Sequence, residues 1–167
     1  MAYLLDANVF IQAKRLHYGM DFCPAFWDWL REKNKKGKVF SIEAVEDELM
    51  AGSDDLSKWA EKMGNRFFLA PDDAMIEALS KVSKWVHGQN YRTAAIHAFL
   101  QDADYYLVAY ALAHGHVLVT HEVASDGVRQ VKIPNVCLGV QVKFKNPFEM
   151  LRRERASFVL DSRRGTS

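Results

Sequence analysis

Short apolar runs alternate along the chain with longer stretches in which apolar residues recur every three or four positions. The runs at residues 3–5, 39–42, 67–69 and 117–120 have the length and the Leu, aromatic and β-branched content of buried strands. The period of the stretches between them predicts helices over residues 9–16, 24–36, 43–50, 54–63, 71–87 and 93–100. Strands that alternate with helices in this way predict a mostly parallel sheet with helices on both faces.

The last third of the chain adds a buried helix, an edge strand and a short terminal helix. Residues 105–113 carry apolar side chains all around the helical wheel, which is typical of a helix that is buried on every side. We expect residues 136–140 to form the last strand, at an edge of the sheet, and a short helix to start at Pro147. The pattern therefore predicts an α/β fold with a central sheet of four to five strands.

Composition indicates one compact domain. With 167 residues, of which 49% are hydrophobic and 26% charged, we expect a single domain at residues 1–150 and a basic tail at residues 151–167. No window approaches the roughly 20 apolar residues that span a bilayer, and no leader is evident, so we expect a cytoplasmic protein without a membrane partner. Cys23 and Cys137 lack the spacing of a zinc site, and we expect both thiols to be reduced.

The net charge of +1 hides two basic clusters. Residues 151–167 hold five arginines against two acids, and residues 31–38 hold five basic residues against one acid. Such clusters can hold a phosphate backbone without reading bases, or they can be solvated helix ends. Three further lysines could flank an RNA path or could equally be ordinary surface residues: Lys132, Lys143 and Lys145.

Four acidic residues fall where the predicted fold would bring them to one edge of the sheet. Asp6 directly follows the first strand, and Glu122 comes two residues after the fourth. Asp104 precedes the buried helix, and Glu48 lies near the apolar stripe of its own helix. Because ligands of α/β proteins bind beyond the carboxyl ends of parallel strands, these acids are candidates for chemistry.

Each acid also has a simpler interpretation. Asp6 and Asp104 could cap the helices that follow them, since Asp is favoured at N-caps. Glu48 could stand at the rim of the core with its carboxylate in water, and Glu122 could be an ordinary acid of a surface loop. A neighbouring acid could take the place of three of them. Glu46 could replace Glu48, Asp102 could replace Asp104, and Asp126 could replace Glu122.

Carboxylates that crowd together raise one another's pKa unless a cation neutralises them. Mg²⁺ and Mn²⁺ prefer oxygen ligands and can activate a water molecule for attack on a phosphodiester. The four acids together therefore predict a site for Mg²⁺ or Mn²⁺ and metal-assisted hydrolysis. Asn8 and Thr120 could donate hydrogen bonds that orient the carboxylates or the water.

The residues that carry these acids resemble the PIN-domain nucleases, which include the VapC-type toxins of bacterial toxin-antitoxin systems. The matching segments span nearly the whole chain in the family's order: residues 5–8, 45–49, 103–104 with Ala111, and 118–122. The opening run through residues 22–29 also resembles an uncharacterised PIN-like subfamily. The resemblance assigns the metal to Asp6, Glu48, Asp104 and Glu122, with Asn8 and Thr120 as supports.

The same resemblance implies a three-layer α/β/α sandwich and a metal-dependent endoribonuclease that acts on an RNA substrate. It also implies a homodimer and a cognate antitoxin protein as partners. Glu122 departs from the family's pattern, in which the fourth acid is commonly Asp.

Two other functions are weighed against the ribonuclease. A phosphatase with Asp6 as its nucleophile is disfavoured, because Asn8 stands where that chemistry needs a second Asp. A catalytically silent PIN-like domain that binds RNA or a protein stays open.

Overall fold

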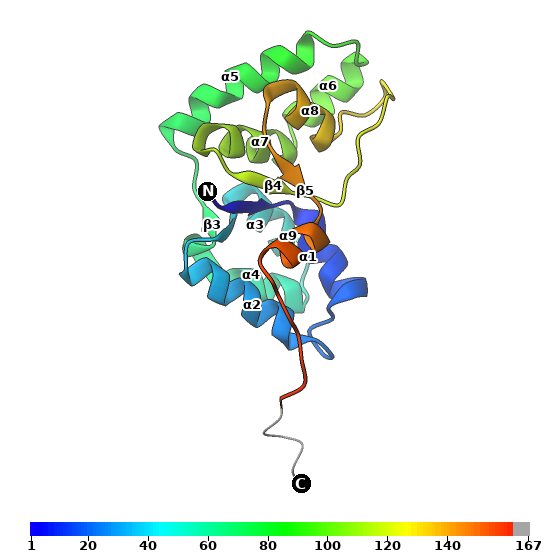
Figure 1. Ribbon diagram of the computed structural model, residues 1–167. Helices are drawn as coiled ribbons and strands as arrows, with labels where there is room; N and C mark the ends of the chain where they lie inside the picture. The colour runs from blue at the N-terminus through cyan, green and yellow to red at the C-terminus, as the bar shows by residue number, and fades with distance from the viewer. Residues whose placement is uncertain (162–167) are drawn as a thin grey trace.

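The computed structural model describes residues 1–161, and its centre is a sheet of five parallel strands. The strands lie in the order β3-β2-β1-β4-β5 (Figure 1). Their bounds are β1 Tyr3–Leu5, β2 Val39–Ile42, β3 Phe68–Leu69, β4 Val117–Val119 and β5 Phe144–Lys145. Helices cover both faces, so the three-layer α/β/α sandwich with a parallel sheet is confirmed.

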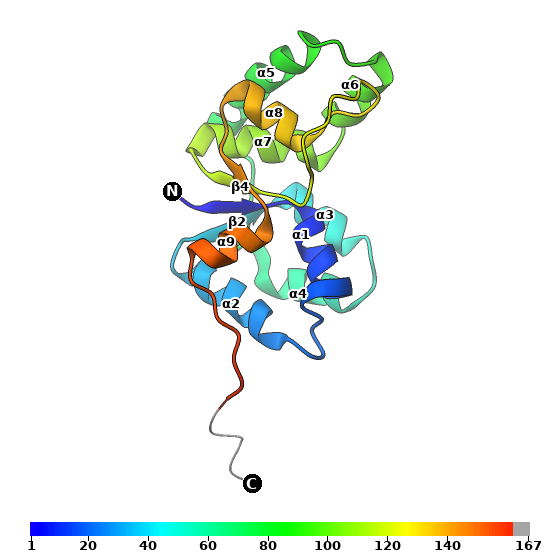
Figure 2. The ribbon, with the colours of Figure 1, turned by 45° about the vertical axis from the view of Figure 1, so that its right-hand side comes forward.

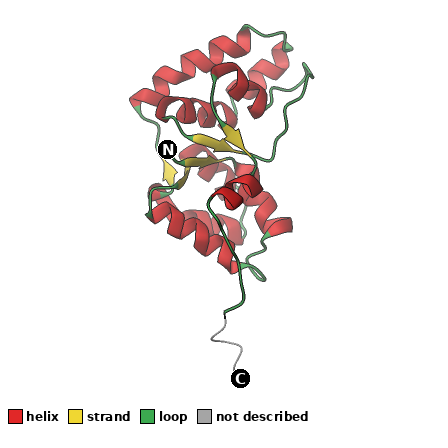
Figure 3. Ribbon diagram, viewed as in Figure 1, coloured by secondary structure: helices red, strands yellow, loops and turns green. Residues whose placement is uncertain are grey.

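The helices form two outer layers (Figures 1 and 3). One layer contains α1 Ala7–Gln12, α2 Pro24–Lys35, α4 Asp55–Met63 and α9 Pro147–Arg153. The opposite layer contains α5 Asp73–His87, α6 Thr93–Leu100, α7 Ala103–His114 and α8 Ile133–Val140. Helix α3, Glu43–Met50, follows β2 without a loop and contacts α1, α4 and α7, so it lies beside the edge of the sheet (Figure 2).

The central strands β1 and β4 are short and buried on both faces, which explains why their sequences are unbroken apolar runs. Tyr3 pairs with Val39 on one side and with Val117 on the other, so β1 is the central strand. All three residues of β1 and all three of β4 are buried. Helix α7 packs along α5, and its buried residues lie all around its axis, as its uniformly apolar sequence predicts.

Aromatic side chains fill the core between the sheet and the layer of α2 and α4. The Trp59 ring contacts Phe10, Trp27 and Phe67, with ring centroids 5.0 to 5.6 Å apart. Two of the four tryptophans, Trp27 and Trp59, are therefore core residues.

The prediction of an edge strand at residues 136–140 is wrong, because these residues belong to helix α8. The edge strand is β5, which pairs with β4 through Leu118 and Phe144. Pro134 lies in the first turn of α8, where its missing N–H is no loss. The buried positions of α8 follow the helical period: Ile133, Val136, Cys137 and Val140. Residues 136–140 taken alone are a short apolar run, as in a strand. The helical period becomes visible only when Ile133 is included.

Helix α8 touches α5 at a glycine. A Cβ atom built on Gly139 would lie 1.9 Å from the ring of Trp85, so only glycine lets the two helices approach this closely. The Trp85 ring is thereby held between α5 and α8.

Three expectations about the chain as a whole remain. Within residues 1–161, no helix is long and apolar enough to cross a membrane. Cys23 and Cys137 are both free thiols, as expected, and Cys137 is buried. The predicted basic tail starts inside α9, whose Leu151 is buried, and its Arg163 and Arg164 lie outside the described residues.

Candidate active site

The site lies at the carboxyl edge of the sheet, between β1 and β4. After β1 the chain continues into α1 in one helical layer, and after β4 it continues to α8 in the other (Figure 1). Adjacent parallel strands whose connections leave to opposite faces open a crevice at their carboxyl ends. Asp6 is the first residue after β1 and Thr120 is the first after β4, so both stand at this crevice.

Asp6 is held in place by its neighbours on β4. Its backbone N–H donates to the Val119 carbonyl at 2.9 Å, and the Thr120 hydroxyl donates to Asp6 Oδ2 at 2.8 Å. The side chain is only 5% exposed. Burial raises the pKa of Asp6 to about 7, although the hydrogen bond from Thr120 opposes the change. The charges of Glu122 and Glu48 raise the pKa of Asp6 further.

Asp104 stands in the first turn of α7. Burial raises its pKa to about 8, and four carboxylates add to the increase: Asp6, Asp102, Glu122 and Glu48. The structure therefore brings the four acids of the sequence prediction within electrostatic reach of one another. We call Asp6, Glu48, Asp104 and Glu122 the acid edge. Asp102, the N-cap residue of α7, lies beside this group rather than in place of Asp104.

Glu48 lies at the rim of the acid edge. Its side chain is exposed, yet partial burial raises the pKa of its carboxyl, and the charge of Asp102 adds to this. Glu48 lines one small hollow with Asp102 and a second with Lys14, whose ammonium is paired with Asp54. The rim interpretation of Glu48 thus describes its position better than a place on the buried half of α3.

Glu122 is engaged with a helix rather than with the other acids. Its Oε2 accepts a hydrogen bond from the Ile133 backbone N–H at 2.7 Å, at the start of α8. Its own backbone N–H donates to Thr120 Oγ1 at 3.1 Å. The charge of Glu122 still reaches Asp6 and Asp104, because it raises the pKa of both.

The two other substitutes that the sequence offered lie apart from this group. Asp126 lines a pocket with Trp85 and Tyr91, between α5 and α8. The pKa of Glu46 is raised by burial and by the charges of Asp47 and Glu43, its neighbours on α3.

The side chains of Asn8 and Thr120 are hydrogen-bonded to each other across the ends of β1 and β4. The Asn8 amide donates to Thr120 Oγ1 at 3.5 Å and accepts from the His121 backbone N–H at 3.2 Å. Thr120 is 1% exposed, and its hydroxyl donates once, to Asp6, while it accepts twice. A hydroxyl has one donor and two acceptor sites, so Thr120 is saturated and its orientation is fixed.

A stack of rings beside the site was not found from the sequence. His121 stacks on His17 with ring centroids 5.6 Å apart, and the Phe148 ring meets both edge-on. Burial and the charge of His17 lower the pKa of His121. His17 is placed by a π-helical turn, Ala13–His17, which continues α1. Such turns are often found at functional sites, but no spacing in the sequence shows this one.

The chemistry of the acid edge fits a hard divalent cation. All four side chains offer oxygen, and the charges named above as acting on Asp6 and Asp104 are carboxylates. Within residues 1–161, no three acidic, His or Cys side chains are already arranged around one point as metal ligands. Glu122 would have to leave Ile133 to join the other acids.

Comparisons with known proteins agree with this architecture. Among solved structures, VapBC2 from Rickettsia felis bound to a DNA fragment from their promoter is similar, with a TM-score of 0.54 at 12% identity. The match covers 87% of this chain and 98% of that chain, and it shows a PIN-like fold. No curated protein matches the sequence. A family model matches residues 3–158, so the chain belongs to the family described as a domain of unknown function (DUF4411).

Proposed function

We propose that the protein is a Mg²⁺- or Mn²⁺-dependent endoribonuclease that acts as the toxin of a toxin-antitoxin pair. The observation that carries the proposal is the acid edge itself. Two carboxyl groups, Asp6 and Asp104, are largely buried at the carboxyl edge of a parallel sheet, with pKa values raised to about 7 and about 8. Carboxylates are rarely crowded and buried without a partner, and a divalent cation is the partner that their oxygens suit.

Asp6 and Asp104 would hold the cation, and Glu48 and Glu122 would complete its ligands. A bound cation of this kind neutralises the carboxylates and makes a water molecule acidic enough to attack a phosphodiester. Thr120 donates to Asp6 Oδ2 and so fixes the orientation of this carboxyl group, which would help to hold the cation. Asn8 holds Thr120 in that orientation. Only ionised carboxyl groups would hold the cation, so near neutral pH Asp6 and Asp104 would have to give up their protons to bind it.

The partners follow from the same proposal. The shared fold with VapBC2, a PIN-domain toxin-antitoxin complex, supports a cognate antitoxin. The homodimer, the RNA substrate and the cytoplasmic location stay predictions.

RNA cleavage by the purified protein tests the proposal. Total cellular RNA is incubated with Mg²⁺, with Mn²⁺ and with EDTA, and the same reactions are run with Asp6→Asn. We expect cleavage with either metal, no cleavage in EDTA, and a loss of at least about 100-fold in the variant, since a cation ligand is removed. Asp47→Asn is the matched control, because Asp47 is an exposed acid of α3 that faces away from the site, and it should cleave as the wild type does.

Other outcomes would contradict the proposal. Cleavage that survives EDTA or the Asp6→Asn substitution would exclude this mechanism. The engagement of Glu122 with Ile133 favours one second candidate, a catalytically silent domain that binds RNA or a protein. Absence of cleavage, together with no Mn²⁺-dependent increase in stability, would support that candidate instead.

A further inference from the structure

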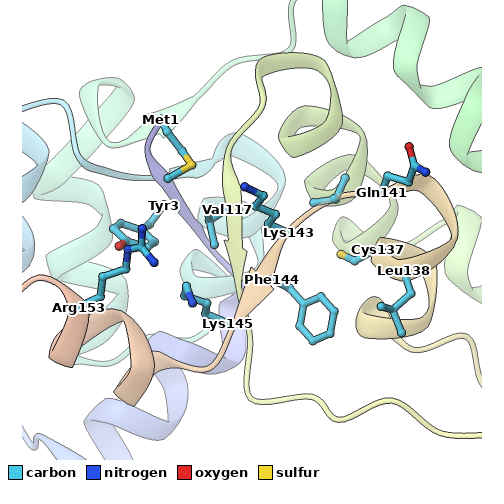
Figure 4. A pocket seen from close by; sticks show the side chains of 11 residues that line it. Met1, Tyr3, Val117, Cys137, Leu138, Gln141, Lys143, Phe144, Lys145 and Arg153 are labelled. Carbon is cyan, nitrogen blue, oxygen red and sulfur yellow. The ribbon is translucent and has the colours of Figure 1, made fainter.

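A pocket away from the acid edge lies along β5, the strand at one side of the sheet (Figure 4). Its volume is about 440 Å³. Three basic side chains line it, and we call Lys143, Lys145 and Arg153 with this hollow the cation pocket. Tyr3, Phe144 and Leu138 also contribute to its walls.

The sheet register explains why the lysines gather there. Lys145 pairs with Val119, and Val117 pairs with Tyr3. Side chains alternate along a strand, so Lys143 and Lys145 point to the same face as Tyr3. Figure 4 shows Lys145 on the same side of β5 as Tyr3 and Arg153, while the Phe144 ring points to the other side.

Arg153 reaches the pocket because α9 is firmly placed. A capping box between Asn146 and Glu149 starts this helix, and Met150 and Leu151 bury its inner face. The Arg153 charge lowers the pKa of Tyr3, against burial and the charge of Glu154, which raise it. The charge of Arg153 therefore reaches Tyr3, which is part of the wall of the pocket.

The three cations have no acidic partner in the part of the chain that the structure describes. The ion pairs there involve other basic residues: Lys14, Arg31, Lys33, Lys35 and His114. Glu154, the acid nearest to Tyr3, is paired with Lys33 at 3.7 Å. In a chain with a net charge of only +1, three uncompensated cations around one hollow favour an anionic ligand.

The walls restrict that ligand further. Phe144 and Leu138 add apolar surface to the same pocket, on the side of β5 opposite to Lys145 and Arg153, so a ligand that uses both parts crosses the edge of the strand. A small inorganic anion would leave this surface uncovered, and an apolar ligand would leave the cations unpaired. Arg binds phosphate through two parallel hydrogen bonds, and an aromatic ring such as Phe144 can stack against a base. The volume is within the range of about 300 to 1,000 Å³ that is typical of pockets for small ligands.

We propose that the cation pocket binds a nucleotide, with Lys145 and Arg153 on its phosphate and the apolar wall beside its base. The phosphate belongs either to a free nucleotide or to the phosphorylated end of an RNA chain. This binding needs neither the acid edge nor a divalent cation, so it goes beyond the nuclease activity.

Calorimetric titration of the full chain in EDTA tests the proposal. The probes are AMP, ATP, adenosine, and a tetranucleotide RNA with and without a 5′-phosphate. We expect a phosphorylated probe to bind at least about tenfold more tightly than its counterpart without phosphate, because only the phosphate accepts charged hydrogen bonds from Lys145 and Arg153. Preference for AMP or ATP identifies a free nucleotide, and preference for the 5′-phosphorylated RNA alone identifies an RNA end.

Substitutions locate the binding. The double variant Lys145→Gln with Arg153→Gln should bind the phosphorylated probe at least about tenfold more weakly than the wild type, because both phosphate contacts are lost. The matched control is Lys36→Gln, at an exposed position after α2, which should bind as the wild type does. Asp6→Asn should also bind normally, which separates this proposal from the nuclease. Urea unfolding verifies that each variant is folded.

Three results would overturn the proposal. They are equal binding with and without phosphate, unchanged affinity in the double variant, and absence of binding by every probe. An acidic hexapeptide serves as a further probe, to test whether the pocket binds a segment of a protein. If it binds more tightly than the nucleotides and its binding is lost in the double variant, the pocket receives a protein segment instead.

Discussion

The acid edge and the cation pocket each gather charges of one sign on the same sheet, but only the acid edge has a buried charged group, Asp6. Asp6 is 5% exposed, whereas Lys143 and Arg153 are exposed and Lys145 is half-buried. Water screens charges that it can reach, so crowded exposed cations cost little. Water cannot screen Asp6 and Asp104 in the same way, and their pKa values rise to about 7 and about 8. Burial therefore makes the ionised form of the acids costly unless a cation neutralises it, whereas water screens the exposed cations of the cation pocket.

The largest expected effect is on the pH dependence of stability in the metal-free protein. In the folded state Asp104 keeps, up to about pH 8, a proton that the unfolded state releases near pH 4. Its contribution to stability is therefore fully present below about pH 4 and is lost as pH rises toward 8. Relative to wild type, the unfolding free energy of Asp104→Asn should grow by on the order of 3 kcal/mol between pH 5 and pH 8.

Urea unfolding in EDTA at several pH values measures this change. Asp47→Asn is the control, because Asp47 is exposed, and its difference from wild type should not vary over the same range. Parallel curves for Asp104→Asn and wild type would mean that the folded protein already carries an ionised Asp104. The proposed contrast between the two sites would then fail.

The second effect is stabilisation by Mn²⁺. At a free concentration of 100 times the dissociation constant, Mn²⁺ should raise the unfolding free energy by about 2.7 kcal/mol, because only the folded state brings the acids together. Thermal unfolding at pH 7 with increasing Mn²⁺ measures it. Asp104→Asn should lose most of the increase, whereas Lys145→Gln should keep it. Equal stabilisation of wild type and Asp104→Asn would place the cation elsewhere.

A smaller effect is expected at Thr120, which orients Asp6. Thr120→Val keeps the shape but removes the hydroxyl that donates to Asp6 Oδ2. The unfolding free energy at pH 7 should fall by about 1 to 3 kcal/mol, since buried partners lose a hydrogen bond. Thr120→Ser, which keeps the hydroxyl, should recover most of the loss in the same urea titration. A serine variant as unstable as the valine variant would show that restoring the hydroxyl does not restore the stability, which would contradict the assigned role of the hydrogen bond.

The smallest effect belongs to the cation pocket. Arg153→Gln, at an exposed position, should change the unfolding free energy by less than about 0.5 kcal/mol, and Lys145→Gln, at a half-buried position without an ion pair in the described residues, by little more. Urea midpoints at low and high salt measure this change. A destabilisation of about 1 kcal/mol or more would show that these cations support the fold. The acid edge and the cation pocket would then differ less in their effect on stability.

Much of this architecture was visible in the sequence, because it depends on local patterns. The strands at 3–5, 39–42 and 117–120 and the buried helix α7 follow from apolar periodicity alone. The place of Asp6 at a strand end also followed, since the carboxyl ends of parallel strands meet at one edge.

The missed features depend on contacts between distant segments. Glu122 was expected among the acids, but its carboxylate meets the Ile133 N–H only because the loop after β4 brings α8 back to it. The exposure of Glu48 was one of two interpretations left open by the sequence, and the packing of α3 against α1 and α7 decides between them. Lys143 and Lys145 were noted as basic residues, but their convergence with Arg153 requires the register of β5 and the placement of α9.

The contact between Gly139 and Trp85 bears on how this chain can vary among its relatives. Since a Cβ atom at residue 139 would lie 1.9 Å from the indole ring, Gly139 cannot gain a side chain unless Trp85 changes or α8 moves. The two residues should be inherited together. In any relative that carries a larger side chain at the position of Gly139, we expect a small residue where Trp85 stands.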